Sequence, residues 1–298
     1  MRGVLVERCS TGIEGFDIIS QGGFVKNSTN VLIGGPGSGK TTFILQFLYN
    51  GATKFNEPGL YCSFEPDIVE TLKDGMAFGW DFARLNEQDK VKFLKFSPRT
   101  SISDLKSELT KLIARYGIKR VCFDPVSVLA LNLNDDGQIR EQMFELVSLM
   151  KRLNVTSIMA DESLENENIS SAEMSWSKTD IIKFLADSVS VFYESGMSGV
   201  SDRAIRITKM RRTSHERKPI GMKLGDEGVE IIADRQNYNK SNGGQMRQES
   251  APSQTQILSA PQQNVPIQPS RQQPQNVQNQ VPNNSRVQSS VVRGRVVM

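Results

Sequence analysis

The sequence predicts an α/β fold in which a mostly parallel sheet is flanked by helices and continued by an antiparallel C-terminal extension. Short β-rich segments alternate with segments of helical periodicity, and several β-rich segments are apolar throughout, as strands covered on both faces are. After residue 185 the pattern changes to strands linked by Gly- or Asp-containing turns, which indicates antiparallel pairing. Alternating strands and helices make right-handed crossovers the simplest connections.

Five strands of the parallel part are predicted at 30–35, 59–65, 91–96, 120–126 and 156–161. Apolar residues recur at helical spacing from Ile102 to Tyr116, with Gly117 as the stop, and again from Ile139 to Leu153. The segment 163–179 follows neither period, so we expect a long surface loop, and loops of that length are often functional.

Composition divides the chain of 298 residues near position 236. Beyond Tyr238 no aromatic residue occurs, and Gln, Asn, Ser and Pro dominate, which is too polar to offset the entropy of ordering. From Lys240 on, six basic residues face the single acidic residue Glu249, which gives this part a net charge of +5 and leaves −2 for the rest of a chain whose total is +3. We predict a folded domain over 1–235 and a disordered, basic tail over 236–298.

The tail has several candidate roles. It could serve solubility alone, or its arginines could contact nucleic acid, lipid or an acidic partner protein. Its apolar end, VVRGRVVM, could add a strand to the sheet edge of a partner.

Cysteine usage and hydropathy indicate a cytoplasmic protein. Cys9, Cys62 and Cys122 share no C-x-x-C spacing, and the last two lie in apolar strand-like segments, so they are interpreted as buried small hydrophobes. The N-terminus lacks the apolar stretch of a signal peptide, and no segment approaches the ~18 apolar residues that cross a bilayer.

A phosphate-binding loop is the strongest motif. Residues 30–42 read NVLIGGPGSGKTT, with the G-x-x-x-x-G-K-T spacing between a predicted strand and a predicted helix. Glycines let backbone N–H groups point at phosphate oxygens, and the helix N-terminus favours negative charge. We expect nucleoside triphosphate contacts from Gly35, Pro36, Gly37, Ser38, Gly39, Lys40, Thr41 and Thr42, with Lys40 reaching the β and γ phosphates.

Two carboxylates complete the predicted hydrolytic site. Asp124 ends a buried strand, where it would hold Mg²⁺ together with the Thr41 hydroxyl. Glu65 ends the second strand, where it would orient or deprotonate the attacking water. The structural alternatives are a strand-end turn for Asp124 before Pro125, and a helix entrance for Glu65 before Pro66.

From about Ser10 to Ile232 the chain resembles the KaiC family of RecA-like ATPases. The resemblance rests on the loop and on further segments in the family's order: STGIEGFDIISQGG, LQFLYNGATKFNEPGLYCSFEP, FGWDF, REQMFELVSLMKRLNVTSIMADE and KMRRTSH. It implies a RecA-like P-loop core that assembles as a homo-oligomeric ring, commonly a hexamer, with ATP between subunits.

The resemblance also implies roles for individual residues. Lys209 and Arg211 match residues that reach a neighbour's γ-phosphate, while Thr213 and His215 match positions near the nucleotide. Cations aimed at the transferred phosphoryl group stabilise developing charge, as an arginine finger does. Taken without the resemblance, KMRRTSHERK would be a solvated strand end or a nucleic-acid contact.

The chain departs from the family in two respects. Pro66 stands where the family has a second adjacent glutamate, so the resemblance does not fix the rate of hydrolysis. The circadian member has two repeats and this chain resembles one, so neither its clock function nor its phosphorylation sites transfer, although autokinase activity stays open.

The sequence supports three hypotheses about the function of this chain. The first is a slow, ring-forming ATPase that uses ATP and Mg²⁺. The second is a RecA-like DNA recombination or repair ATPase, which the acidic loop 163–179 disfavours because it contains no arginine. The third is a non-hydrolysing, ATP-gated scaffold of archaellum-motor type, in which the tail docks a partner.

Overall fold

The computed structural model describes residues 6–64, 67–130, 133, 135–162, 181–194, 203–233 and 295–296. By contacts, the chain divides into one unit of residues 1–242 with 292–298 and another of residues 243–291. All described residues belong to the first unit, so the predicted domain boundary at 235/236 stays a prediction. Within the described ranges, no helix is both long and apolar enough to cross a membrane.

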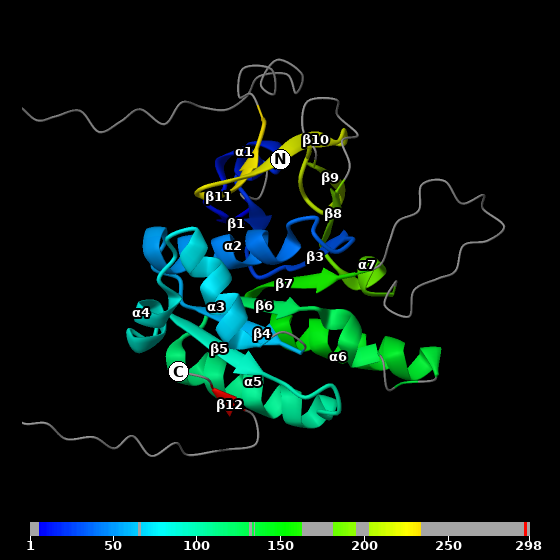
Figure 1. The fold of residues 1–298 in the computed structure, drawn as a ribbon. Coiled ribbons are helices and arrows are strands. Elements are labelled where there is room, and N and C mark those ends of the chain that lie inside the picture. Colours follow the sequence, from blue (N-terminus) through cyan, green and yellow to red (C-terminus); the bar gives the residue numbers. More distant parts are fainter. Residues whose placement is uncertain are drawn as a thin grey trace, which may run out of the picture. The chain divides into compact units, whose positions relative to one another are not determined.

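A ten-stranded sheet forms the centre of the unit (Figure 1). Parallel pairing runs from β8 through β3, β7, β6 and β4 to β5, and antiparallel pairing continues from β8 through β9 and β10 to β11. In sheet order the strands are β11 (Gly228–Ile231), β10 (Ile220–Gly225), β9 (Arg203–Met210), β8 (Ser188–Tyr193), β3 (Thr29–Gly34), β7 (Thr156–Asp161), β6 (Arg120–Asp124), β4 (Gly59–Ser63), β5 (Val91–Lys95) and β12 (Arg295–Val296). A second, two-stranded sheet pairs β1 (Arg8–Cys9) with β2 (Phe24–Val25).

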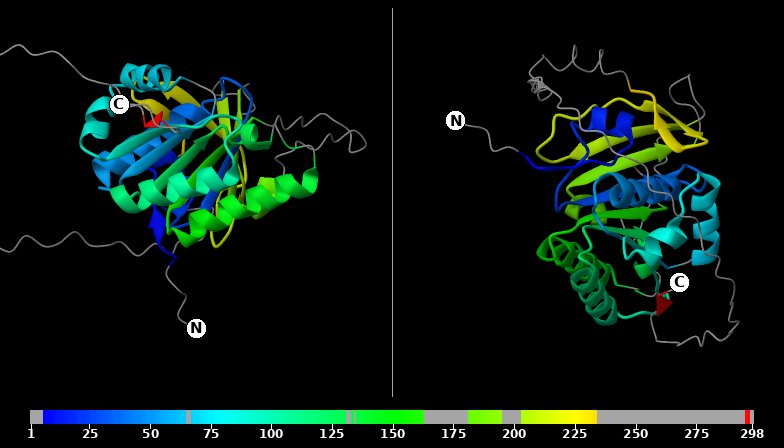
Figure 2. Two further views of the ribbon diagram at one scale, coloured as in Figure 1. Left: turned by 90° about the horizontal axis from the view of Figure 1, so that it is seen from below. Right: turned by 90° about the vertical axis from the view of Figure 1, so that its left-hand side faces the viewer.

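Helices cover both faces of the sheet (Figure 2). One face packs against α1 (Glu14–Ile19), α2 (Lys40–Lys54), α3 (Ile68–Ala77) and α4 (Phe82–Glu87). The other packs against α5 (Ile102–Tyr116), the 3₁₀ helix η1 (Val126–Ala130), α6 (Asp136–Arg152) and α7 (Ile181–Leu185).

The central strands are buried on both sides because their side chains alternate between two hydrophobic cores. In β3, Leu32 belongs to the core beneath α2, whereas Val31 and Ile33 belong to the core beneath α5 and α6. The predicted mostly parallel α/β sheet with an antiparallel extension is therefore confirmed.

Element boundaries differ from the predicted ones mainly at strand ends. The strand predicted over 59–65 ends at Ser63, and the one predicted over 120–126 ends at Asp124 before Pro125, which has no N–H to donate. Gly117 ends α5 in the left-handed conformation at φ 62°, as its position predicts. The loop 163–179 lies outside the described residues, and Arg295 and Val296 of the apolar C-terminal end pair with β5 of the same chain.

Candidate functional site

The phosphate loop joins β3 to α2 and has a backbone that glycine makes accessible. Gly37 and Gly39 adopt φ values of 77° and 98°, a left-handed region that costs other L-residues about 1–2 kcal/mol each. At Gly34 a Cβ atom would lie 2.5 Å from the carbonyl oxygen of Phe192 on the neighbouring strand. The motif's glycines are therefore required by conformation and by close packing.

The N-terminus of α2 differs from those of α3 to α6. Asp67, Asp81, Ser101 and Asp135 each accept a hydrogen bond from a first-turn N–H of their helix. Gly39 precedes α2 without a capping side chain, and the first turn of α2 contains no acidic residue. The first N–H groups of this helix and its positive dipole end are left for an anion, which is the arrangement that binds phosphate.

Lys40 is folded back onto the loop that carries it. Its Nζ donates to the carbonyl oxygens of Gly34 at 2.7 Å and Gly35 at 2.9 Å, and the residue is only 7% exposed. Burial lowers the pKa of this amine below its ordinary value. A phosphate group would add negative charge beside this buried amine, so the loop is arranged to receive one.

Thr41 and Asp124 meet as the sequence predicts. The Thr41 hydroxyl donates to Asp124 Oδ2 at 2.8 Å, and the Tyr61 hydroxyl donates to the same oxygen at 3.1 Å. The strand that carries Asp124 is not adjacent to β3, because β7 lies between them. The carboxylate nevertheless reaches the first turn of α2, and burial raises its pKa.

This pair fits Mg²⁺. The ion prefers hard oxygen ligands and takes one or two protein groups together with phosphate oxygens and water. A hydroxyl and a carboxylate oxygen hydrogen-bonded beside a phosphate loop offer that donor set. Thr41 and Asp124 would hold the ion.

Two acidic residues near Lys40 escaped the sequence analysis. Asp161 ends β7 and is fully buried, Glu162 follows it, and both act electrostatically on Lys40. The signal was present, because the predicted strand TSIMAD ends in a carboxylate at the same edge of the sheet as Asp124. Glu65 and Pro66 lie outside the described residues, so the role of Glu65 stays a prediction.

A further cation approaches the loop from β9. Arg203 begins this strand, and its Nε donates to the carbonyl oxygen of Gly37 at 3.1 Å. No sequence pattern predicts Arg203 at this loop, because its place depends on the antiparallel pairing that brings the start of β9 beside the end of β8.

Lys209 and Arg211 lie at the opposite, amino-terminal end of the sheet. Lys209 pairs with Val189, which pairs with Val31 early in β3, and Arg211 follows the end of β9. Lys209 Nζ donates to the carbonyl oxygens of Lys183 and Phe184, at 3.0 Å each. The structure thus brings these two cations together but does not bring them to the loop of the same chain.

Thr213 and His215 follow these cations along the chain, and the Thr213 hydroxyl donates to the Arg211 carbonyl oxygen at 3.3 Å. The Thr213 hydroxyl accepts a hydrogen bond of 2.7 Å from Arg8, so the N-terminal segment braces the stretch after β9. His215 Nδ1 lies 3.0 Å from the carbonyl oxygen of Glu216.

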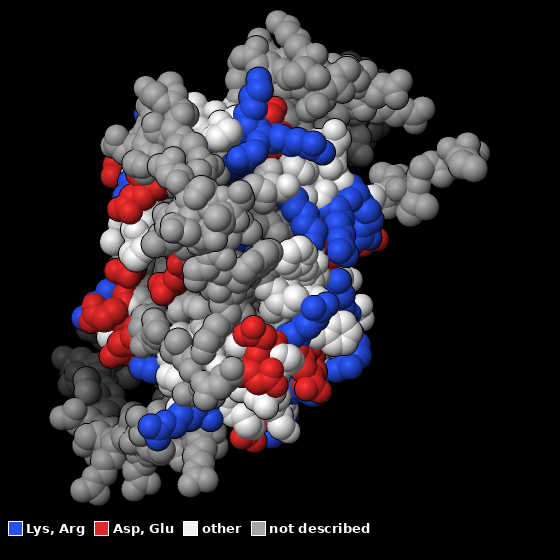
Figure 3. Space-filling view, turned by 90° about the vertical axis from the view of Figure 1, so that its right-hand side faces the viewer, with Lys and Arg blue, Asp and Glu red and all other residues white. Residues whose placement is uncertain are grey.

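In a view of the right-hand side of Figure 1, Lys and Arg side chains gather toward the upper and right-hand parts of the described surface, and Asp and Glu toward the left and below (Figure 3).

Comparison with known proteins places the chain in a family. A family model described as "ATPase: KaiC" matches residues 9–236. The chain belongs to the KaiC family. The circadian clock oscillator proteins KaiC of Prochlorococcus marinus (strain MIT 9313) and Nostoc sp. (strain PCC 7120) are 29% and 32% identical to it over 236 residues, which are 76% of this chain.

This KaiC-family chain spans less than half of the length of those relatives, since the matches cover 46% and 44% of them. This chain is also similar to a solved structure, the crystal structure of a KaiC-like protein from the hyperthermophilic archaeon Pyrococcus horikoshii OT3. The match has 29% identity and a TM-score of 0.66, and it covers 76% of this chain and all of the archaeal chain. The predicted KaiC-like fold and its membership of an ATPase family are therefore confirmed.

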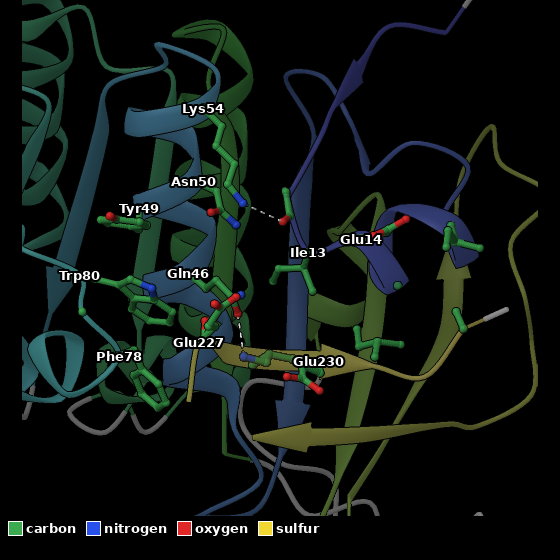
Figure 4. Close-up of a pocket in the computed structure, with 17 residues that line it drawn as sticks. Ile13, Glu14, Gln46, Tyr49, Asn50, Lys54, Phe78, Trp80, Glu227 and Glu230 are labelled. Atoms are coloured by element: carbon green, nitrogen blue, oxygen red, sulfur yellow. Dashed lines mark hydrogen bonds between the residues drawn. The ribbon is translucent and has the colours of Figure 1, made fainter. Parts of the chain in front are cut away.

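A cleft of about 940 Å³ lies away from the phosphate loop, between α2, α1 and β11 (Figure 4). Tyr49, Trp80 and Phe78 stack on one another along one wall. Glu14, Glu227 and Glu230 also line the cleft, against the single basic side chain of Lys54. This excess of negative charge disfavours a triphosphate, so the volume of this cleft does not identify it as the place where the KaiC-family chain binds nucleotide.

Proposed function

We propose that this chain is a Mg²⁺-dependent ATPase of the KaiC family whose active site is completed by Lys209 and Arg211 of a second copy. The observation that carries the proposal is the placement of the phosphate loop and the two cations at opposite ends of one sheet. The match to an ATPase family supports the hydrolytic part of the proposal.

Distance argues against completion within one chain. Lys209 pairs with Val189, which lies beside Val31, and Gly34 is three residues further along β3 than Val31. At about 3.3 Å per residue these steps span roughly 10 Å before the loop begins. A lysine side chain already bound to carbonyl groups at the end of α7 does not bridge that gap. Another copy can present the same cations without deforming the sheet.

Each residue then has a defined task. Lys40 leaves the carbonyl oxygens of Gly34 and Gly35 and donates to phosphate oxygens, while the first N–H groups of α2 bind the same phosphates. Bound Mg²⁺ would neutralise charge on the phosphate oxygens, held by Thr41 and Asp124. Glu65 is proposed to orient the attacking water.

The second copy supplies positive charge at the transferred phosphoryl group. Lys209 and Arg211 of the neighbour would stabilise charge as it develops, a contribution worth ~10³-fold or more for an arginine finger. Thr213 and His215 would lie near the same nucleotide. A closed ring, with six copies as the expected number, gives every copy both a loop and a donor of cations.

Mixing two inactive variants tests the proposal. Lys40→Ala removes the phosphate lysine but leaves the cations, whereas Lys209→Ala leaves the phosphate loop but removes one cation. We expect each variant alone to release almost no phosphate from ATP and Mg²⁺, and the mixture to recover a substantial fraction of wild-type turnover. Two inactive proteins that stay inactive after verified co-assembly would contradict sharing between copies.

The same assay separates the alternatives. A RecA-like DNA ATPase predicts that single-stranded DNA stimulates turnover and that added salt removes the stimulation steeply. A non-hydrolysing scaffold of archaellum-motor type predicts tight ATP binding with no phosphate release even from the wild-type chain. Phosphate appearing on the protein itself would identify autokinase activity. A cytoplasmic location and a partner protein for the tail remain part of the proposal.

A further inference from the structure

Asp187 occupies a distinctive position between α7 and β8, at the amino-terminal end of the sheet. Its carboxylate accepts a hydrogen bond from the backbone N–H of Thr29 at 3.1 Å, and its side chain is 10% exposed. Its own backbone N–H donates to the Thr29 carbonyl at 2.8 Å. The carboxylate is thus fixed to the start of β3, the strand that leads into the phosphate loop.

Three cations gather around this one carboxylate. Lys151 Nζ lies 3.2 Å from Asp187 Oδ2, and Arg211 Nη1 lies 3.7 Å from Oδ1. Asp187 also interacts electrostatically with Lys209. Within the described part of this group the charges are three positive and one negative, which leaves an excess that an anion from outside can neutralise.

Asp187 also fixes the backbone of the segment that carries these cations. The Arg211 N–H donates to the Asp187 carbonyl oxygen at 2.9 Å, so the residue holds Arg211 through both its main chain and its side chain. The Arg211 side chain is 53% exposed, so the guanidinium stays open to solvent while it pairs with Asp187. A guanidinium held on one side and open on the other is oriented toward a partner.

We infer that Asp187 is a positioning residue, which orients Arg211, and with it Lys209, for contact with the nucleotide bound by a neighbouring copy. This inference rests on the proposed function, in which those cations act between copies. The carboxylate does not touch the nucleotide. It reduces the mutual repulsion of the cations and limits the directions in which Arg211 can point. Arg211 therefore loses less side-chain entropy when it contacts the γ-phosphate of the neighbouring copy.

The test places one substitution in either member of a mixed assembly. Asp187→Asn keeps an acceptor for the Thr29 N–H but removes the charge that binds Arg211. It is combined with Lys40→Ala to make a donor of cations whose own loop is inactive, and this donor is mixed with Lys209→Ala acceptors. The matched control donor carries Glu145→Gln, which removes a carboxylate from an ion pair with Lys106 at 2.9 Å, at the contact between α5 and α6.

We expect the Asp187→Asn donor to rescue about 10-fold to 100-fold less turnover than the Lys40→Ala donor, with little change in KM, because misplaced groups cost rate at this scale. The Glu145→Gln donor should rescue fully. The same Asp187→Asn substitution in the Lys209→Ala acceptor should have no effect, since that copy contributes only its loop.

Each other outcome has a distinct meaning. Equal rescue by the Asp187→Asn and Lys40→Ala donors would overturn the positioning role and leave the shared site intact. Loss of rescue from both placements would show a structural role and would equally overturn the inference. No rescue by the Lys40→Ala donor itself would instead reject the shared site on which the inference rests.

Discussion

The two ends of the central sheet both hold a lysine against backbone carbonyl groups, yet they are built for opposite tasks. At the carboxyl end, Lys40 is buried against Gly34 and Gly35, beside helix N–H groups that no side chain caps. At the amino end, Lys209 rests on carbonyl groups at the end of α7, while the neighbouring Arg211 is about half exposed and paired with Asp187.

This difference teaches how one chain can carry both halves of a shared site. The carboxyl end has a helix N-terminus that no side chain caps and a buried lysine that donates to carbonyl oxygens of its own loop, so it is suited to bind an incoming anion. The amino end has its cations already supported on one side and facing outward on the other, so it is suited to present charge. The carboxyl end is thus suited to bind the phosphates, and the amino end to present cations to a neighbouring copy.

The sharpest test of this contrast compares ATP affinity, measured in dilute protein, with turnover, measured in the assembled protein. Lys40→Ala should weaken ATP binding roughly 10-fold to 100-fold, because a charge-assisted hydrogen bond to phosphate contributes about 1.5–3 kcal/mol. Lys209→Ala should leave affinity within about twofold while turnover falls about 10³-fold. Calorimetry with a slowly hydrolysed ATP analogue, beside a phosphate-release assay, measures both quantities. Equal losses of affinity in the two variants would remove the distinction between the ends.

Asp124→Asn is expected to separate function from stability. Turnover should fall about 10²-fold or more because the carboxylate that would hold Mg²⁺ is lost. The ligand-free protein should become more stable at pH 8, by about 1 kcal/mol, because a buried charge is removed while the hydrogen bonds from Thr41 and Tyr61 can persist.

The pH dependence gives the sign of this second effect. Burial raises the pKa of Asp124 in the folded state above its value in the unfolded state. The wild-type protein therefore loses stability as pH rises from the unfolded-state pKa through the folded-state pKa. The gain in melting temperature of Asp124→Asn should therefore be larger at pH 8 than at pH 4.5, where the native carboxyl is closer to neutral. A gain that grows toward acid pH would contradict the assignment.

Much of this architecture could be predicted because local pattern and tertiary context agree. The apolar strands, the stop at Gly117 and the loop around Lys40 follow from periodicity and glycine placement. Meeting of Thr41 and Asp124 followed from two strand ends sharing one edge of the sheet.

The remainder depended on the order of strands. The insertion of β7 between β3 and β6, the approach of Arg203 to Gly37 and the gathering of cations around Asp187 arise from contacts between distant segments. The strand predicted over 120–126 ends at Asp124 because Pro125, which has no N–H to donate, ends the ladder earlier than apolar content suggests.

Arg203→Ala should have a moderate effect that is confined to the carboxyl end. Loss of its hydrogen bond to the Gly37 carbonyl should weaken ATP binding about 3-fold to 10-fold, corresponding to about 0.5–1.5 kcal/mol. Arg206→Ala is a matched control, because Arg206 lies on the same strand and donates to the carbonyl oxygen of Arg217 at 3.0 Å. Titration of a fluorescent ATP analogue measures both variants, and equal weakening would show that the effect is not specific to the loop.

The smallest expected effect is a shift of the alkaline limb of the pH profile. Burial and the nearby positive charge of Arg211 lower the pKa of Lys209, so its charge is lost as pH rises through a value below the ordinary one. Lys209→Arg keeps a cation throughout, because guanidinium remains protonated up to pH ~12, and should move the alkaline limb of kcat to higher pH. Lys106→Arg, remote from the nucleotide, should leave the profile unchanged. Bound phosphate raises the pKa of Lys40, so Lys40 is not expected to produce this limb once ATP is bound. An alkaline limb that stays unchanged in Lys209→Arg would therefore mean that Lys209 does not act as a cation in the step that limits turnover.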